Sequence, residues 1–86
     1  MTRLWSAGEP VQMAFGPDGA PQAFLWASAW HPVAAIANRW RVRASWWAPA
    51  AAAWQEYVKL TTADGLLCVL VHDLQSDAWR LVRLFD

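Results

Sequence analysis

The titratable side chains that could do catalysis are few in this sequence and poorly placed. It has two histidines, one cysteine and seven carboxylates, and only His72 and Asp73 are neighbours. Adjacent residues of a strand point to opposite faces of a sheet, so these two side chains would not form an orienting pair. Cys68 lies in an apolar run, which is typical of a small buried hydrophobic residue and not of a nucleophile. We therefore expect a protein that is not an enzyme.

Metal and cofactor chemistry is not indicated either. His31, His72 and Cys68 show no paired spacing of the Cys-x-x-Cys or His-x-x-x-His type that metal sites use. The four glycines are scattered and form no phosphate-binding loop. The expectation is a protein without a bound metal ion or cofactor.

Arginine and tryptophan carry the strongest binding signal. Residues 39–44 alternate without a break, so three arginines share one strand face, opposite Trp40 and Val42. Cations beside aromatic rings bind single-stranded nucleic acid, and the same residue types are common in protein-interface hot spots. A solvated strand face beside core tryptophans is the alternative interpretation. The candidate residues for binding a protein partner or nucleic acid are Arg39, Arg41, Arg43, Trp46, Trp47 and Trp54.

The composition of the chain favours a protein partner over nucleic acid. Hydrophobic residues make up 57% of the 86 residues, charged residues 16%, and the seven basic side chains cancel the seven acidic ones. This excludes disorder and a polybasic tail, so a protein partner is expected ahead of single-stranded DNA. The longest apolar run, 66–71, is too short to cross a membrane, and one cysteine suits a reducing compartment. We expect a cytoplasmic protein with no membrane contact, and low charge with many tryptophans favours a homodimer.

Turn signals divide the chain into short strands. The sequence Gly16-Pro17-Asp18-Gly19 predicts a hairpin across 10–27, and Asp64-Gly65 joins the expected strands 57–62 and 66–72. A last strand over 79–85 completes a meander, with a bulge near Val82 because strict alternation would turn Arg83 inward.

The remaining segments complete an all-β prediction. Pro32 favours an extended segment over 30–38, and the alanine-rich stretch after Pro49 favours one short helical turn near 49–55. The predicted fold is a small, partly open β-barrel or a strongly twisted antiparallel meander of five to six strands. It occupies residues 10–86, after an N-terminal extension over 1–9.

Eight tryptophans are too many for a domain of this size to bury completely. Trp26, Trp40 and Trp79 lie on alternating strands and are the predicted core tryptophans. The others either form an interface or, at Trp5, Trp30 and Trp54, plug the open ends of a barrel.

The order of tryptophans and turns also carries a resemblance. The pattern comprises Asp18-Gly19-x-Pro21-x-x-Phe24-x-Trp26, Trp30-His31-x-Val33, Arg39-Trp40-Arg41-Val42-x-x-x-Trp46-Trp47, Tyr57-x-x-x-Thr61-x-x-Asp64-Gly65 and Asp77-x-Trp79-x-Leu81. Over residues 10–86 it resembles a small uncharacterised bacterial domain. That domain stands alone or forms the C-terminal domain of inactive Y-family polymerase homologues of bacterial mutasomes. The resemblance implies a role in DNA-damage tolerance and translesion synthesis, with the polymerase machinery as partner, and implies no catalytic activity.

Overall fold

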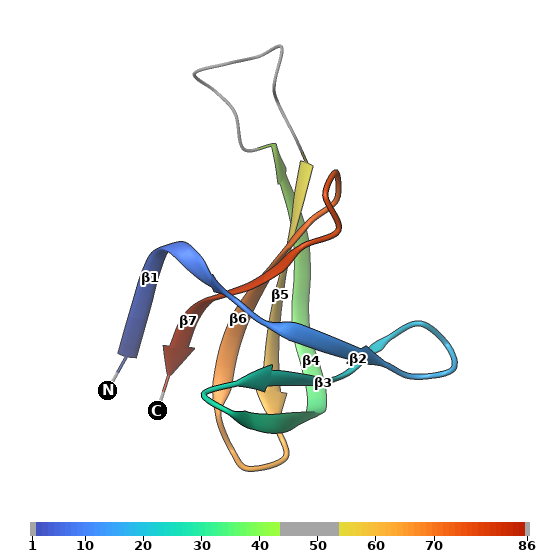
Figure 1. Ribbon diagram of the computed structural model, residues 1–86, viewed down its shortest axis with the longest axis vertical. Helices are drawn as coiled ribbons and strands as arrows, with labels where there is room; N and C mark the ends of the chain where they lie inside the picture. Colours follow the sequence, from blue (N-terminus) through green and yellow to red (C-terminus); the bar gives the residue numbers. More distant parts are fainter. Residues whose placement is uncertain (1, 44–53, 86) are drawn as a thin grey trace.

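The computed structural model describes residues 2–43 and 54–85 (Figure 1). All regular elements in these ranges are β-strands, which confirms the predicted all-β class. The chain forms seven strands where five to six were expected. They are β1 (Thr2–Pro10), β2 (Gln12–Phe15), β3 (Pro21–Trp26), β4 (Ala29–Arg43), β5 (Trp54–Thr62), β6 (Leu67–Asp73) and β7 (Trp79–Phe85).

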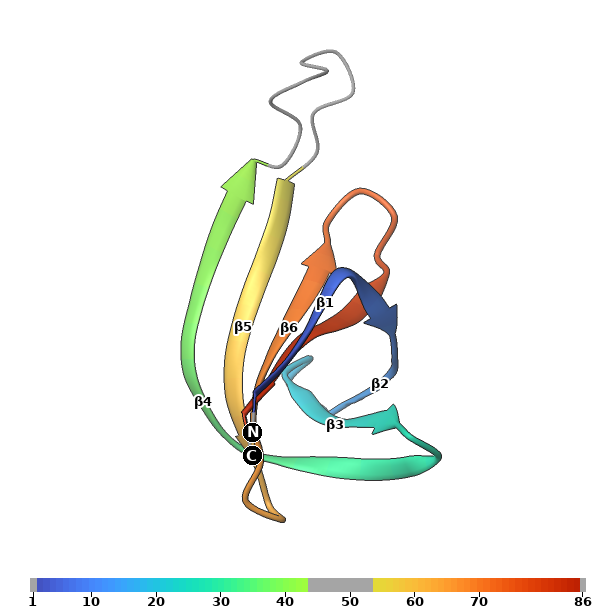
Figure 2. The same ribbon diagram turned by 90° about the vertical axis from the view of Figure 1, so that its left-hand side faces the viewer.

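The strands form one antiparallel sheet that curls toward closure. Their order is β1-β7-β6-β5-β4-β3-β2, so β1 and β2 lie at opposite edges although only Val11 separates them in the chain. The edges must therefore approach each other, and the sheet becomes a half-barrel (Figure 2). A hydrogen bond from Trp26 Nε1 on β3 to Glu9 on β1, at 3.0 Å, supports this. The Val11 N–H donates to the Trp79 carbonyl at 3.1 Å, which continues the pairing of β1 with β7 up to the start of β2.

Residues 2–10 belong to this sheet. They form β1, which pairs with β7 from Thr2 opposite Phe85 to Pro10 opposite Arg80. The segment 1–9 was expected to be an N-terminal extension that precedes the domain. The segment forms a strand because its backbone pairs with that of β7, which its own side-chain pattern did not predict.

The predicted hairpins and meander are present. β2 and β3 flank the turn at 16–20, and β5, β6 and β7 follow one another as neighbours. The bulge near Val82 is confirmed, since Arg83 pairs with Val69 and Leu81 pairs with Leu70. The bulge lets Arg83 face away from the core while the leucines on either side of it stay buried.

We call the side of the sheet that carries the core the inner face, and the opposite side the outer face. Trp79 is 8% exposed and Trp26 packs partly buried against the core, as predicted for both. Cys68 is fully buried, and this burial raises the pKa of its thiol to about 11. The core residues are Phe24, Val58, Leu60, Cys68, Leu70, Trp79, Leu81 and Leu84.

The prediction that Trp40 lies in the core is wrong. The strand β4 is extended over 30–38, as expected, but its pairing with β5 shifts between Val33 and Ala35 and again between Ile36 and Asn38. Each extra residue reverses which side chains face inward, so the two reversals cancel between Val33 and Arg39. Both residues lie opposite buried residues of β5, and Trp40 therefore lies opposite Tyr57 on the outer face, where it is 38% exposed.

Three expectations concern the segment between β4 and β5. Trp46, Trp47 and most of the helical turn near 49–55 lie outside the described residues, whereas Trp54 and Gln55 belong to β5. Trp30 and Trp54 are 51% and 53% exposed, so neither plugs an end of the barrel. In the described ranges, no helix is long and apolar enough to cross a membrane.

We expect Gly8→Ala to lower the free energy of unfolding by about 1–3 kcal/mol, measured by urea denaturation. Gly8 has a φ of +78°, and an added Cβ would lie 2.8 Å from Arg80 Cβ on β7. Gly19 has a φ of +79° and open space around it, so Gly19→Ala is the control for backbone strain alone. Equal losses in the two variants would show that the contact with Arg80 contributes nothing.

Candidate functional site

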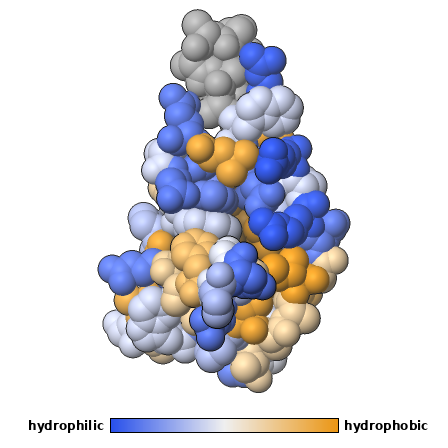
Figure 3. Space-filling model, turned by 90° about the vertical axis from the view of Figure 1, so that its right-hand side faces the viewer, coloured by the Kyte–Doolittle hydropathy of each residue, from blue (hydrophilic) through white to orange (hydrophobic). Residues whose placement is uncertain are grey.

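The sequence-predicted site residues that the structure describes come together at one end of the inner face. Arg39, Arg41 and Arg43 share this face of β4, and Trp54 of β5 lies directly opposite Arg43. On the side of the molecule drawn in Figure 3, hydrophilic side chains gather in the upper half, where β4 and β5 project beyond the core. Trp46 and Trp47, the other members of the predicted group, lie outside the described residues.

Two of these arginines already have an internal partner. Arg39 Nη2 donates to Glu56 Oε1 at 2.5 Å, and Arg41 Nε lies 3.6 Å from Glu56 Oε2. The hydrogen bond from Arg39 holds the pKa of the Glu56 carboxyl below its ordinary value, although burial opposes this effect. Among the described residues, Arg43 has no such carboxylate partner.

Glu56→Gln should make the protein less stable at neutral pH and less sensitive to acid. The folded-state pKa of Glu56 is lowered, so its ion pairs stabilise the protein above the unfolded-state pKa of about 4.3 and are lost as the pH falls through the folded pKa. Urea midpoints measured from neutral pH into acid should converge for the two proteins. A constant gap between them would contradict this role of Glu56.

An acid–base pair that sequence reasoning missed lies nearby on the inner face. His72 Nε2 lies 2.5 Å from Asp77 Oδ1, and the His72 ring stacks on Trp79 with centroids 4.2 Å apart. Asp73, the sequence neighbour, instead accepts hydrogen bonds from the Gln75 and Ser76 N–H groups. The sequence signal for this pair was that His72 and Asp77 flank the predicted turn between two strands.

These groups line an inner pocket of about 410 Å³. Arg39 and Arg41 contribute two positive charges to it, and Glu56 and Asp77 contribute two negative ones. None of the described residues that line it is a serine or cysteine that could serve as a nucleophile beside His72. The balance of charge makes this pocket a poor site for a polyanion.

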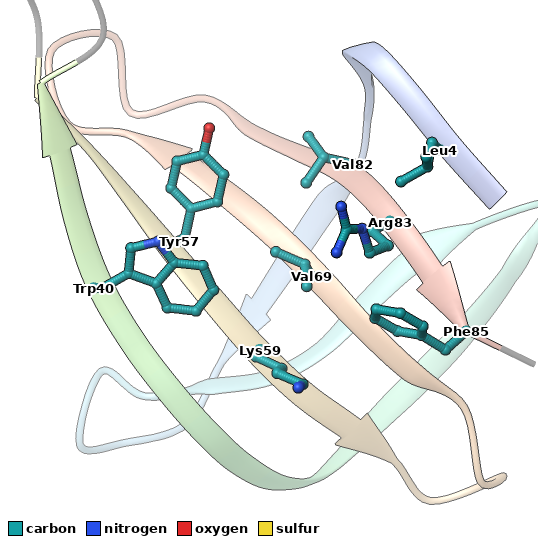
Figure 4. A pocket seen from close by; sticks show the side chains of 8 residues that line it. All are labelled: Leu4, Trp40, Tyr57, Lys59, Val69, Val82, Arg83 and Phe85. Carbon is teal, nitrogen blue, oxygen red and sulfur yellow. The ribbon is translucent and has the colours of Figure 1, made fainter. Parts of the chain in front are cut away.

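A larger pocket of about 630 Å³ lies on the outer face (Figure 4), and we call it the outer pocket. Five strands supply its lining, which the sheet register brings together from distant parts of the chain. Its residues are Leu4, Trp40, Tyr57, Lys59, Val69, Val82, Arg83 and Phe85.

Aromatic rings give the outer pocket its shape. Trp40 stacks on Tyr57 with centroids 5.4 Å apart and planes inclined by 17°. Phe85 lies under two cations, with Lys59 Nζ 5.9 Å and Arg83 Cζ 5.5 Å from its ring centroid. In Figure 4 the Trp40 and Tyr57 rings lie on one side of the pocket and Phe85 on the other. Planar surfaces and positive charges therefore alternate across the face.

The outer pocket is positively charged although the whole chain is neutral. Lys59 and Arg83 line it, and none of the described residues that line it is a carboxylate. Within the described ranges, the cationic members of the side-chain ion pairs are His31, Arg39, Arg41 and His72. No carboxylate in these ranges therefore pairs with Lys59 or Arg83. Sequence analysis did not find this site because its residues lie on five strands: Tyr57 and Lys59 on β5 and Arg83 and Phe85 on β7 meet only through the sheet.

The chemistry of the outer pocket fits a planar, negatively charged ligand. In the described part of the chain, no group of three or more histidine, cysteine, aspartate or glutamate side chains is placed to hold a metal ion. Comparison of the chain with protein-family models, with curated proteins and with solved structures gives no match.

Proposed function

We propose that the protein is a non-enzymatic module that binds single-stranded nucleic acid in the outer pocket. One observation carries this proposal: three aromatic rings and two cations, neither of which pairs with a carboxylate among residues 2–43 and 54–85, line one pocket on a sheet face. Stacking on aromatic side chains contributes about 1–3 kcal/mol per base, and cations beside the rings neutralise phosphates.

Single strands fit this face better than a duplex. The stacking surfaces are Trp40, which is 38% exposed, and Phe85 between its two cations. A base can stack on them only when it is free of its own neighbours, as in a single strand. Arg80 lies opposite Val71 and is exposed, so it extends the positive charge along β7 on the same face.

This proposal keeps the alternative ligand of the sequence analysis but moves it to other residues. The residues proposed to bind are Trp40, Lys59, Arg83 and Phe85, in place of the arginine face of β4. A role in DNA-damage tolerance remains a proposal that rests on the resemblance alone, and a cytoplasmic location remains one that rests on the single cysteine. Single-stranded DNA is a ligand consistent with such a role.

The first test is a titration of tryptophan fluorescence with a single-stranded DNA oligonucleotide at several salt concentrations. Neutralisation of two phosphates, by Lys59 and Arg83, predicts that log K falls with log salt at a slope of about −1.4. Lys59→Ala should reduce the slope to about −0.7. Binding that does not change with salt, or equal affinity for the same oligonucleotide annealed into a duplex, would contradict the proposal.

Trp40→Ala should weaken oligonucleotide binding by about 5- to 150-fold, because it removes one stacking surface. Trp30→Ala is the matched control, since Trp30 is also exposed and lies on β4, outside the outer pocket. Anisotropy of a labelled oligonucleotide measures both variants. A similar loss in the two proteins would exclude a specific role for Trp40.

A further inference from the structure

The strand β4 has an open edge over most of its length. It pairs with β3 over 29–32 and with β5 over 33–43. On the β3 side, the backbone of 33–43 therefore has no strand partner within the described ranges, and Figure 2 shows this part of β4 at the margin of the sheet. The Arg39 N–H donates to Asn38 Oδ1 at 2.9 Å, so a side chain satisfies this backbone donor. An unpaired edge is a template for an added strand.

The side chains along this edge are sorted by face. Arg39, Arg41 and Arg43 lie on the inner face, and Trp40 and Val42 lie on the outer face, each 38% exposed. Glu56 is the carboxylate that pairs with these arginines, so an excess of positive charge remains. Side chains directly opposite each other on paired strands are about 5 Å apart, which is close enough for ion pairs.

We infer that this edge docks an extended segment of a partner protein in which acidic and apolar residues alternate. The acidic residues would pair with the arginines, and the apolar ones would cover Trp40 and Val42. A second copy of the chain fits less well, because antiparallel pairing of β4 with itself would set arginine against arginine. The inference goes beyond nucleic-acid binding, and the two sites share only Trp40.

The experiment measures the anisotropy of a short labelled peptide in which glutamate alternates with valine. Its control is a peptide of the same composition in which the glutamates form one block, which has the same charge but cannot match the arginines. We expect tighter binding of the alternating peptide and protection of the 38–43 amides from hydrogen exchange. Arg43→Glu should weaken this binding by about 5- to 10-fold, and Arg80→Glu, the same charge change on the outer face, should leave it unchanged.

Arg43 is chosen because Arg39 and Arg41 hold the buried Glu56, and their replacement would disturb the fold. Equal affinity for the two peptides, or no binding of either, would overturn the inference. A dimer in sedimentation that Arg43→Glu dissociates would also overturn it, because a second copy would then occupy the edge. Neither variant alters Trp40, which both sites use, or any other residue of the outer pocket, so loss of peptide binding can be told apart from loss of nucleic-acid binding.

Discussion

Replacing both Trp40 and Phe85 by alanine is expected to weaken single-stranded oligonucleotide binding by about 2–6 kcal/mol, the sum of two lost stacking surfaces. The rings lie on β4 and β7, with β5 and β6 between them, so their contributions should add. Each ring lies partly exposed at the surface and outside the core, so the double variant should remain folded. Isothermal titration or anisotropy at low salt would give the loss.

Two controls accompany this experiment: one shows that the double variant is folded, and the other measures the oligonucleotide binding that its remaining cations support. Circular dichroism should show that the double variant keeps its strands. Because Lys59 and Arg83 remain, the residual binding should keep the salt dependence of the original protein. A double variant that binds as tightly as the original would remove stacking from the mechanism and leave charge alone.

Phe24→Ala should lower the free energy of unfolding by about 3–5 kcal/mol. Phe24 is fully buried on β3, where it packs in the core and stacks on His31 with centroids 5.4 Å apart. Its removal leaves a cavity in a core that a chain of this length cannot easily refill. Domains have about 5–15 kcal/mol of stability in total, so this variant should be close to unfolding at room temperature.

Phe15→Ala is the control for this prediction. It removes the same atoms from a ring that is 48% exposed and lies in the same β2–β3 hairpin. Urea denaturation should show a much smaller loss for Phe15→Ala than for Phe24→Ala. Comparable losses would mean that burial of Phe24 does not hold β3 against the sheet.

Turn chemistry and alternation predicted the strands because both act over a few residues. The Asp64-Gly65 turn, the extended segment after Pro32 and the bulge at Val82 are all present. β1 was not expected, since a strand held by backbone pairing needs no pattern of its own.

Alternation along β4 could not show which of its two faces points toward the core. Alternation separates the arginines from Trp40 and Val42, but the pairing with β5 decides which group faces inward, because Arg39 and Arg41 lie opposite the buried Val58 and Glu56. That pairing joins β4 to a strand that begins only at Trp54. The pairing of Arg39 and Arg41 with buried Glu56 follows from the same register.

The sequence by itself determined an all-β domain of short strands, a buried cysteine and Trp79 in the core, because each depends on local pattern and hydrophobicity. The tertiary structure alone decided which cations and rings meet. Lys59, Arg83 and Phe85 join Trp40 only because β4, β5, β6 and β7 pair in a fixed register within one curled sheet. A binding surface that spans several strands cannot be predicted from any single segment of the chain, since strand pairing is a contact between distant residues.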